Sequence, residues 1–191
     1  MIRKLSIVIA LVFISQPAVS EQILDRQALS SAAIKKGWQQ VDTKPDVLAP
    51  TQHLDTALMH FYHAIVLDKT SGPAWFATAY TYSIKRDTDS ALSAYRTSLT
   101  FQPDYPSTHM NIGVLLLEKG DMKNSLRSLL KARDLAPERG SVHGNLARWY
   151  YTNKKITEAK AELALAYKYQ SPEDAAFLKL LSKFINNSVS H

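Results

Sequence analysis

The residues in this sequence whose types and spacing could support chemistry are histidines. His60 and His63 lie three residues apart, which places both imidazoles on one face of a helix, and His53 lies just before them. A zinc ion takes three or four protein ligands, so these histidines would need a further partner such as Asp55. Two histidines at this spacing also occur on solvated helices. We favour the solvated interpretation and predict no metal, with a metal-binding protein or enzyme that uses His60 and His63 as a minor alternative.

Other catalytic chemistry has little support in the sequence. The chain has no cysteine, which excludes a thiolate nucleophile, a thiolate metal site, an iron–sulfur cluster and a disulfide. It has no glycine-rich phosphate loop, no Gly-x-Ser-x-Gly motif and no His-Glu-x-x-His motif. The sequence therefore predicts a protein that is not an enzyme and that uses no cofactor.

The first 20 residues have the three parts of a secretory signal peptide. Arg3 and Lys4 precede an apolar run from Leu5 to Ile14, and the small residues Ala18 and Ser20 end the segment. A membrane helix needs about 20 apolar residues, so this shorter run favours a signal cleaved after Ser20 over a retained anchor, which is the alternative. An export signal without a lipidation cysteine predicts a periplasmic or secreted protein, most simply of a Gram-negative bacterium, with no membrane span after cleavage.

The charge of the chain argues against a nucleic-acid partner. The sequence has 23 basic and 17 acidic residues, and the leader holds two of the basic ones. Its removal leaves a formal charge of +4. A nucleic-acid binder would instead carry a clustered basic stripe, so we predict no nucleic-acid partner.

The elements that position these residues repeat along the chain. Pro103 and Pro137 are 34 residues apart, and Pro172 follows 35 residues later. A period of 20 to 50 residues is typical of solenoid proteins. The units that align without gaps at a period of 34 are 72–105, 106–139 and 140–173.

The three units carry residues of matching size in the same columns. The fourth column holds Trp75, His109 and His143; the eighth Ala79, Gly113 and Ala147; the eleventh Tyr82, Leu116 and Tyr150; the twenty-fourth Tyr95, Leu129 and Leu163. Small residues let paired helices approach closely and large ones fill the space between them. Because His109 and His143 occupy the column of Trp75, packing explains them better than catalysis.

This pattern, closed by a proline in each unit, resembles the tetratricopeptide repeat. The resemblance implies an all-α fold, an α-solenoid of antiparallel helix pairs wound into a right-handed superhelix, and binding of a partner segment in its concave groove. The helix pairs predicted from the columns and turn residues are 73–86 with 89–101, 107–119 with 122–135, and 141–152 with 156–169.

The flanking segments extend the pattern in part. Residues 53–71 look like the second half of a further repeat, because Phe61 lies 34 residues before Tyr95. Prolines break the expected first half, so 21–52 is predicted to be a helix over 22–40 that caps the stack or stays mobile, followed by an irregular linker. Residues 172–187 form an amphipathic segment that we predict to be a capping helix over the apolar end of the stack.

The resemblance also predicts which residues line the groove. They lie on the first helix of each pair at positions that the helix seam does not need: Phe76, Tyr80, Ser83, Met110, Asn111, Val114, Leu117, Asn145, Arg148 and Tyr151. Aromatic anchors, two amides and one arginine suit a peptide or partner segment. The sequence thus predicts a non-enzymatic protein-protein interaction scaffold in envelope assembly or secretion. The alternative is a structural subunit that forms a homo-oligomer through the groove or the C-terminal helix.

Overall fold

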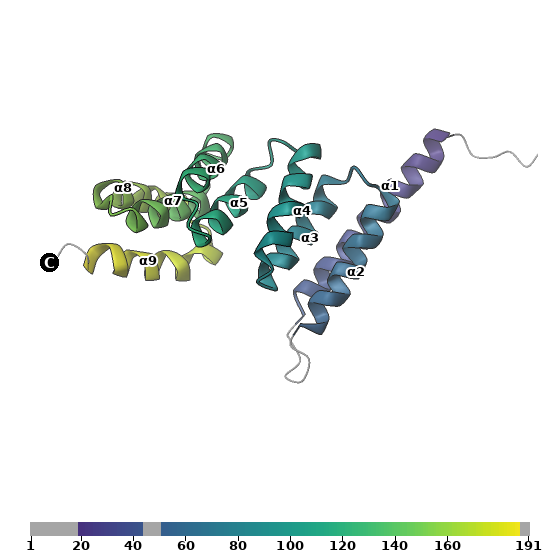
Figure 1. The fold of residues 1–191 in the computed structure, drawn as a ribbon, viewed down its shortest axis with the longest axis horizontal. Helices are drawn as coiled ribbons and strands as arrows, with labels where there is room; N and C mark the ends of the chain where they lie inside the picture. Colours follow the sequence, from purple (N-terminus) through teal and green to yellow (C-terminus); the bar gives the residue numbers. More distant parts are fainter. Residues whose placement is uncertain (1–18, 44–50, 188–191) are drawn as a thin grey trace, which may run out of the picture.

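The computed structural model describes residues 19–43 and 51–187, and the predicted leader over 1–18 lies outside this range. The described residues form nine α-helices and one short 3-10 helix, with no strand among them. The helices are stacked in an elongated row that starts at α1 and ends at α9 (Figure 1). The predicted all-α solenoid is confirmed.

The helices follow one another with short connections. Their bounds are α1 Val19–Val41, α2 Gln52–Leu67, α3 Gly72–Ile84, α4 Thr88–Phe101, α5 Pro106–Glu118, α6 Met122–Leu135, α7 Gly140–Thr152, α8 Ile156–Lys168 and α9 Ala175–Asn187, with the 3-10 helix over Pro172–Asp174. Each helix from α3 to α8 begins and ends within two residues of its predicted bounds.

The predicted turn residues begin the second helices of two pairs. The Asp87 carboxylate accepts a hydrogen bond from the Ser90 amide, and the Asp121 carboxylate accepts one from the Asn124 amide. Gly120, just before Asp121, has a φ of +80°, a conformation that glycine adopts without steric cost. These caps satisfy amides that the first helical turn leaves without partners, and they fix where α4 and α6 start.

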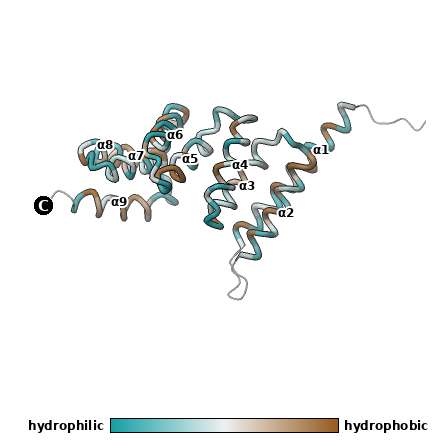
Figure 2. Tube along the Cα trace, viewed as in Figure 1, coloured by the Kyte–Doolittle hydropathy of each residue, from teal (hydrophilic) through white to brown (hydrophobic). Residues whose placement is uncertain are grey.

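The core is divided among several clusters along the row of helices, and Figure 2 shows hydrophobic residues (brown) spread along the row. Within each repeat, the small residue of the eighth column, on the first helix, packs with the large residue of the twenty-fourth column, on the second helix. A Cβ added at Gly113 would lie 2.6 Å from Cγ of Leu129, so this column must stay small. Stability in such a stack is the sum of each pair and its contacts with its neighbours.

The largest departure from the sequence prediction concerns α1. It forms a complete leading pair with α2, whereas the sequence predicted a helix over 22–40 that caps the stack or stays mobile. The Ser30 hydroxyl donates to the carbonyl oxygen of Ala64 at 3.0 Å, and Gly37 lies against the ring of Phe61. Gly37 and Phe61 are 24 residues apart, against 16 for Gly113 and Leu129. An insertion between the two helices therefore hid the repeat, and α1 is docked.

The C-terminal helix α9 takes the place of the next first helix. Leu178, Leu181 and Ile185 are buried against the last pair, 35 residues after His143, Leu146 and Tyr150 of α7. The one-residue shift arises at Pro172, where the 3-10 turn precedes the helix. The predicted capping helix over 172–187 is present, and it follows the register of the repeats.

No helix among the described residues is long and apolar enough to cross a membrane.

Candidate functional site

The first helices of the pairs carry all ten predicted groove residues, and we call the surface that these helices line the groove face. The helices are α1, α3, α5, α7 and α9. Since the repeats align, a residue's column fixes its place on this face. The fifth column holds Phe76, Met110, Gly144 and Lys179, and the ninth holds Tyr80, Val114, Arg148 and Lys183, counting the α9 residues with the shift of 35.

Aromatic rings fill the N-terminal half of the groove face. The ring centroid of Trp38, on α1, lies 5.4 Å from that of Tyr80 and 6.5 Å from that of Phe76. Phe76 also contacts Tyr105 edge to face at 5.1 Å and Tyr95 at 5.6 Å. Offset and edge-to-face contacts of this kind stabilise aromatic clusters. The predicted anchors Phe76 and Tyr80 are therefore already engaged by aromatic residues of this chain.

A small pocket of about 80 Å³ lies beside this cluster. Its lining residues are Tyr80, Ser83, Tyr95, Asn111, Val114 and Leu115. The Asn111 amide nitrogen donates to the Tyr95 hydroxyl at 2.8 Å, and burial raises the pKa of that phenol to about 12. The pocket is about the size of a few water molecules, so it is too small for a large partner side chain.

Three predicted residues face their own chain. Leu117 is buried in the cluster of α5, α6 and α7, so its assignment to the groove lining is wrong. Its position near the end of α5 turns it toward α7. Met110 packs partly against the same cluster, and the Asn145 side-chain amide donates to the carbonyl oxygen of Ser141 at 2.9 Å.

The C-terminal half of the groove face holds an open apolar cleft of about 530 Å³ between α7 and α9. Its lining residues are Arg148, Tyr151, Thr152, Phe177, Leu180, Leu181 and Phe184. Arg148 and Tyr151 were predicted from the sequence. The four α9 residues were not, although the period continued past Pro172 would have placed α9 on this face.

Two α9 side chains in the cleft are unusually exposed for their columns. Phe184 is 51% exposed, whereas the residues at the same column, Trp149 and Leu115, are each 6% exposed. Leu180 is 56% exposed, whereas Asn145 and Asn111 at its column are part-buried and Ala77 is fully buried. The column of Phe184 is thus buried elsewhere in the row, and that of Leu180 is at least partly covered. On α9 both side chains are about half exposed.

Charged side chains lie in the cleft and on the rest of α9. Arg148 lies at its edge and contacts the Glu118 carboxylate at 3.4 Å. Lys179 and Lys183 are exposed on α9 in the fifth and ninth columns, and the sequence of α9 contains no acidic residue. The ninth column thus changes from an aromatic residue at Tyr80 to a cation at Arg148 and Lys183.

The histidines of the fourth column have a structural role. The Trp75 indole donates to the Lys69 carbonyl oxygen, and the rings of His109 and His143 contact the carbonyl oxygens of Pro103 and Pro137 at 2.7 and 2.8 Å. Each ring contacts a carbonyl six residues earlier, in the loop that joins two repeats. The expectation that these histidines pack as Trp75 does is confirmed.

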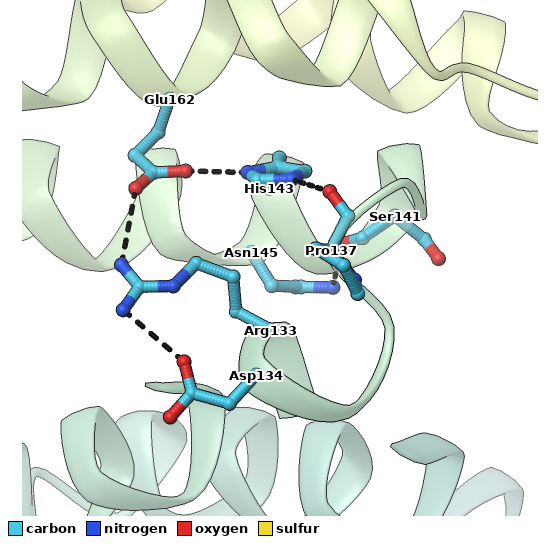
Figure 3. A network of polar contacts seen from close by, with 7 residues as sticks. All are labelled: Arg133, Asp134, Pro137, Ser141, His143, Asn145 and Glu162. Carbon is cyan, nitrogen blue, oxygen red and sulfur yellow. Dashed lines mark hydrogen bonds and ion pairs between the residues drawn. The ribbon is translucent and has the colours of Figure 1, made fainter. Parts of the chain in front are cut away.

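His143 also takes part in a buried polar network (Figure 3). Its Nδ1 lies 2.7 Å from the Glu162 carboxylate, and the other oxygen of Glu162 lies 3.8 Å from Arg133. His143 is 3% exposed. The network joins α6, α7 and α8 through Arg133, His143 and Glu162.

The remaining histidine cluster does not form a metal site in the described part of the chain. There, no three His, Asp or Glu side chains are grouped so that they could hold a metal ion. The third ligand considered for His60 and His63, Asp55, forms an ion pair with Lys85 of α3.

Comparison with known sequences identifies the repeat. Residues 72–105 match the sequence profile of the tetratricopeptide repeat. Among curated proteins, the chain is 23% identical over 113 residues to the anaphase-promoting complex subunit CDC16 of Saccharomyces cerevisiae. That match covers 59% of this chain but only 14% of the yeast protein. The chain thus corresponds to a small part of this relative.

Solved structures share the fold along most of the chain. PilF of Pseudomonas aeruginosa superposes with a TM-score of 0.70 at 22% identity, covering 86% of this chain and 72% of that one. TTC0263, a thermophilic TPR protein of Thermus thermophilus, gives a TM-score of 0.66 at 21% identity, with 80% of both chains covered. Residues 72–105 thus match the tetratricopeptide repeat, two further units follow in register, and the chain shares its fold with solved tetratricopeptide-repeat structures.

Proposed function

We propose that this protein is a non-enzymatic scaffold that binds a segment of a partner protein in the cleft between α7 and α9. The observation that carries the proposal is the open apolar cleft with the half-exposed Leu180 and Phe184, of which Phe184 lies at a column that is buried elsewhere in the row. Apolar side chains gathered around a concavity are typical of protein interaction sites. The fold is that of protein interaction scaffolds, and no residue arrangement described above suggests catalysis.

The relatives support a role within an assembly. The yeast relative is by name a subunit of the anaphase-promoting complex, so its repeats belong to a larger complex. For this chain, we propose a partner in envelope assembly or secretion. The support is the signal-like pattern of the first 20 residues, with two basic residues, an apolar run and a small residue at the expected cut.

Self-association is a second candidate, and a different surface favours it. Leu24 on α1 and Met59 and Val66 on α2 are 66%, 72% and 64% exposed. Large apolar side chains exposed together favour contact with another chain. If this is the functional contact, light scattering will show a dimer that Met59→Ser with Val66→Ser converts to a monomer.

An affinity capture from envelope extract tests the leading proposal. The baits are the wild-type protein, the variant Arg148→Ala with Phe184→Ser, and the control Leu165→Ser, which changes an exposed residue of α8 outside the cleft. We expect the wild type and the control to recover the same partner and the cleft variant to lose it. Equal recovery by all three baits would rule out the cleft as the binding site.

A further inference from the structure

We infer that the α7–α9 cleft binds an amphipathic helix whose polar side is acidic. This inference rests on the proposed function and specifies the partner that the same site would accept. It depends on three features of the cleft: the spacing of its apolar residues, the register of α9 and the sign of the surrounding charges.

The spacing of the apolar residues matches a helical ligand. Phe177, Leu180, Leu181 and Phe184 follow one another along α9 at intervals of three, one and three residues, so they form a stripe about two turns long. Tyr151 lies across from this stripe on α7. A partner helix with apolar residues at matching intervals can pack its ridge between the two helices.

The register explains why the stripe is available. Val142, Asn145 and Trp149 of α7 lie 35 residues before Phe177, Leu180 and Phe184. Val142 and Trp149 are buried by neighbouring helices, and the Trp149 indole donates to the Met122 carbonyl oxygen at the start of α6. On α9, Phe177 and Leu180 are larger than Val142 and Asn145. All three α9 side chains are more exposed than their counterparts on α7. The seam that helices fill elsewhere is thus open here, which favours another helix as its occupant.

The charges select among possible helices. Arg148 lines the cleft and is paired with Glu118, and Lys179 and Lys183 are exposed on α9 next in sequence to the cleft residues Leu180 and Phe184. A partner helix with Asp or Glu beside its apolar stripe can form ion pairs with the two lysines and compete for Arg148. The affinity for an acidic helix should therefore fall as salt rises.

The same charges disfavour two occupants from this protein. The apolar run of the first 20 residues follows Arg3 and Lys4 and has no acidic residue. The α9 helix of a second copy would bring its own Lys179 and Lys183 toward those of the first. Like charges brought together oppose both contacts. A separate, acidic partner fits better.

Matched synthetic peptides test the inference on the full chain. The probes are three designed peptides of about 18 residues: one with a leucine stripe and glutamates, one with the same stripe and lysines, and one with the glutamate composition shuffled to destroy the stripe. Fluorescence anisotropy gives their affinities. We expect the acidic helix to bind at least about tenfold more tightly than either other peptide. If the acidic and basic helices bind equally, the inference that the partner is acidic is wrong. If the shuffled peptide binds as tightly as the acidic helix, the inference that the partner is an amphipathic helix is wrong.

Variants then place the binding in the cleft. Leu180→Ser with Phe184→Ser should weaken the acidic helix by at least about tenfold, while Leu165→Ser leaves it unchanged. Arg148→Glu with Lys183→Glu should reverse the preference toward the basic helix, whereas Lys123→Glu with Lys160→Glu, on exposed surfaces of α6 and α8, should not. Circular dichroism melting of each variant shows whether it is folded. A folded cleft variant that binds normally would overturn the assignment.

Two further measurements address the other occupants. A dimer in light scattering that Leu180→Ser with Phe184→Ser dissociates would overturn the inference in favour of a second copy. Slower hydrogen exchange of residues 175–187 in the full chain than in a chain that starts at Glu21 would overturn it in favour of the N-terminal segment. If capture still depends on the cleft but the acidic helix does not bind, the proposed function stands and this inference alone fails.

Discussion

The two halves of the groove face differ in how their columns are filled. In the N-terminal half, Trp38 of α1 packs on Phe76 and Tyr80, and the pocket beside them measures about 80 Å³. In the C-terminal half, α9 is the end helix of the row, as α1 is at the other end, and a cleft of about 530 Å³ lies between α9 and α7. Both halves are rich in apolar residues. They differ in how much of that apolar surface remains exposed.

This difference separates stability from binding within one repeated architecture. Aromatic residues that pack on one another contribute to the folding of the first two pairs, and Tyr80 and Tyr105 remain 37% and 39% exposed. Leu180 and Phe184 of α9 contribute less to folding because about half of their surface stays exposed, and that surface is available for association. Repeat columns alone therefore do not show which part of the groove is open. The positions of the end helices α1 and α9 must also be known.

The largest expected effect is on folding at the closed end. Phe61 is fully buried between α1 and α2, with Trp38 edge to face at 5.5 Å. Phe61→Ala should lower the free energy of unfolding by about 3 to 5 kcal/mol. Phe184→Ala should lower it by less than about 1 kcal/mol because that ring is half exposed. Urea unfolding followed by circular dichroism measures both, and similar losses would remove the distinction between the two halves.

A second comparison uses the two histidines of the fourth column. His143→Phe removes the partner of the buried Glu162 carboxylate as well as the contact with the Pro137 carbonyl oxygen. His109→Phe removes only the contact with the Pro103 carbonyl oxygen. We expect a loss of about 2 to 3 kcal/mol for the first and about 1 kcal/mol for the second. If the two variants melt alike, the network does not stabilise the C-terminal half.

The smallest expected effect is a change with pH in how much the Asp121 helix cap raises the melting temperature. Hydrogen bonds from the side chain and backbone of Asn124 lower the pKa of Asp121 below its ordinary value of 3.8. A lowered pKa means that the cap stabilises the folded chain above the ordinary value and that this contribution disappears as pH falls through the lower one. The melting temperature of Asp121→Ala should therefore lie below that of the wild type at pH 7, with the gap closing below pH of about 3.

The α8 helix provides the control for this experiment. It begins after Lys155, which makes no side-chain cap hydrogen bond. Lys155→Ala should therefore give a melting difference that does not close in acid. A gap for Asp121→Ala that persists at low pH would show that the carboxylate is not what stabilises the start of α6.

Much of this fold could be predicted from the sequence because the repeats constrain it strongly. Size and shape recur every 34 residues, and Gly113 and Leu129 show why, since no larger residue fits at the first position. The leading pair could not be predicted by the same period. The insertion before α2 lengthens the separation between Gly37 and Phe61 to 24 residues, eight more than between Gly113 and Leu129. The small residue Gly37 was the one sequence feature that still indicated the first helix of this pair.

The candidate site was harder to predict than the fold. Column positions located Arg148 and Tyr151, which line the cleft, but they also selected Leu117, which turns into the interface with α7. A column gives the direction of a side chain and does not show what already covers it. The aromatic contacts of Trp38 and the exposure of Phe184 depend on how α1 and α9 dock, and a one-residue shift at Pro172 conceals the register of α9.

The central claim is that a partner contacts the open half of the groove face and leaves the closed half unchanged. Hydrogen–deuterium exchange of the protein, with and without the captured partner, tests this most directly. We predict slower exchange in residues 144–152 and 175–187 and no change in residues 76–83. Protection of residues 76–83 without protection of α9 would contradict the account.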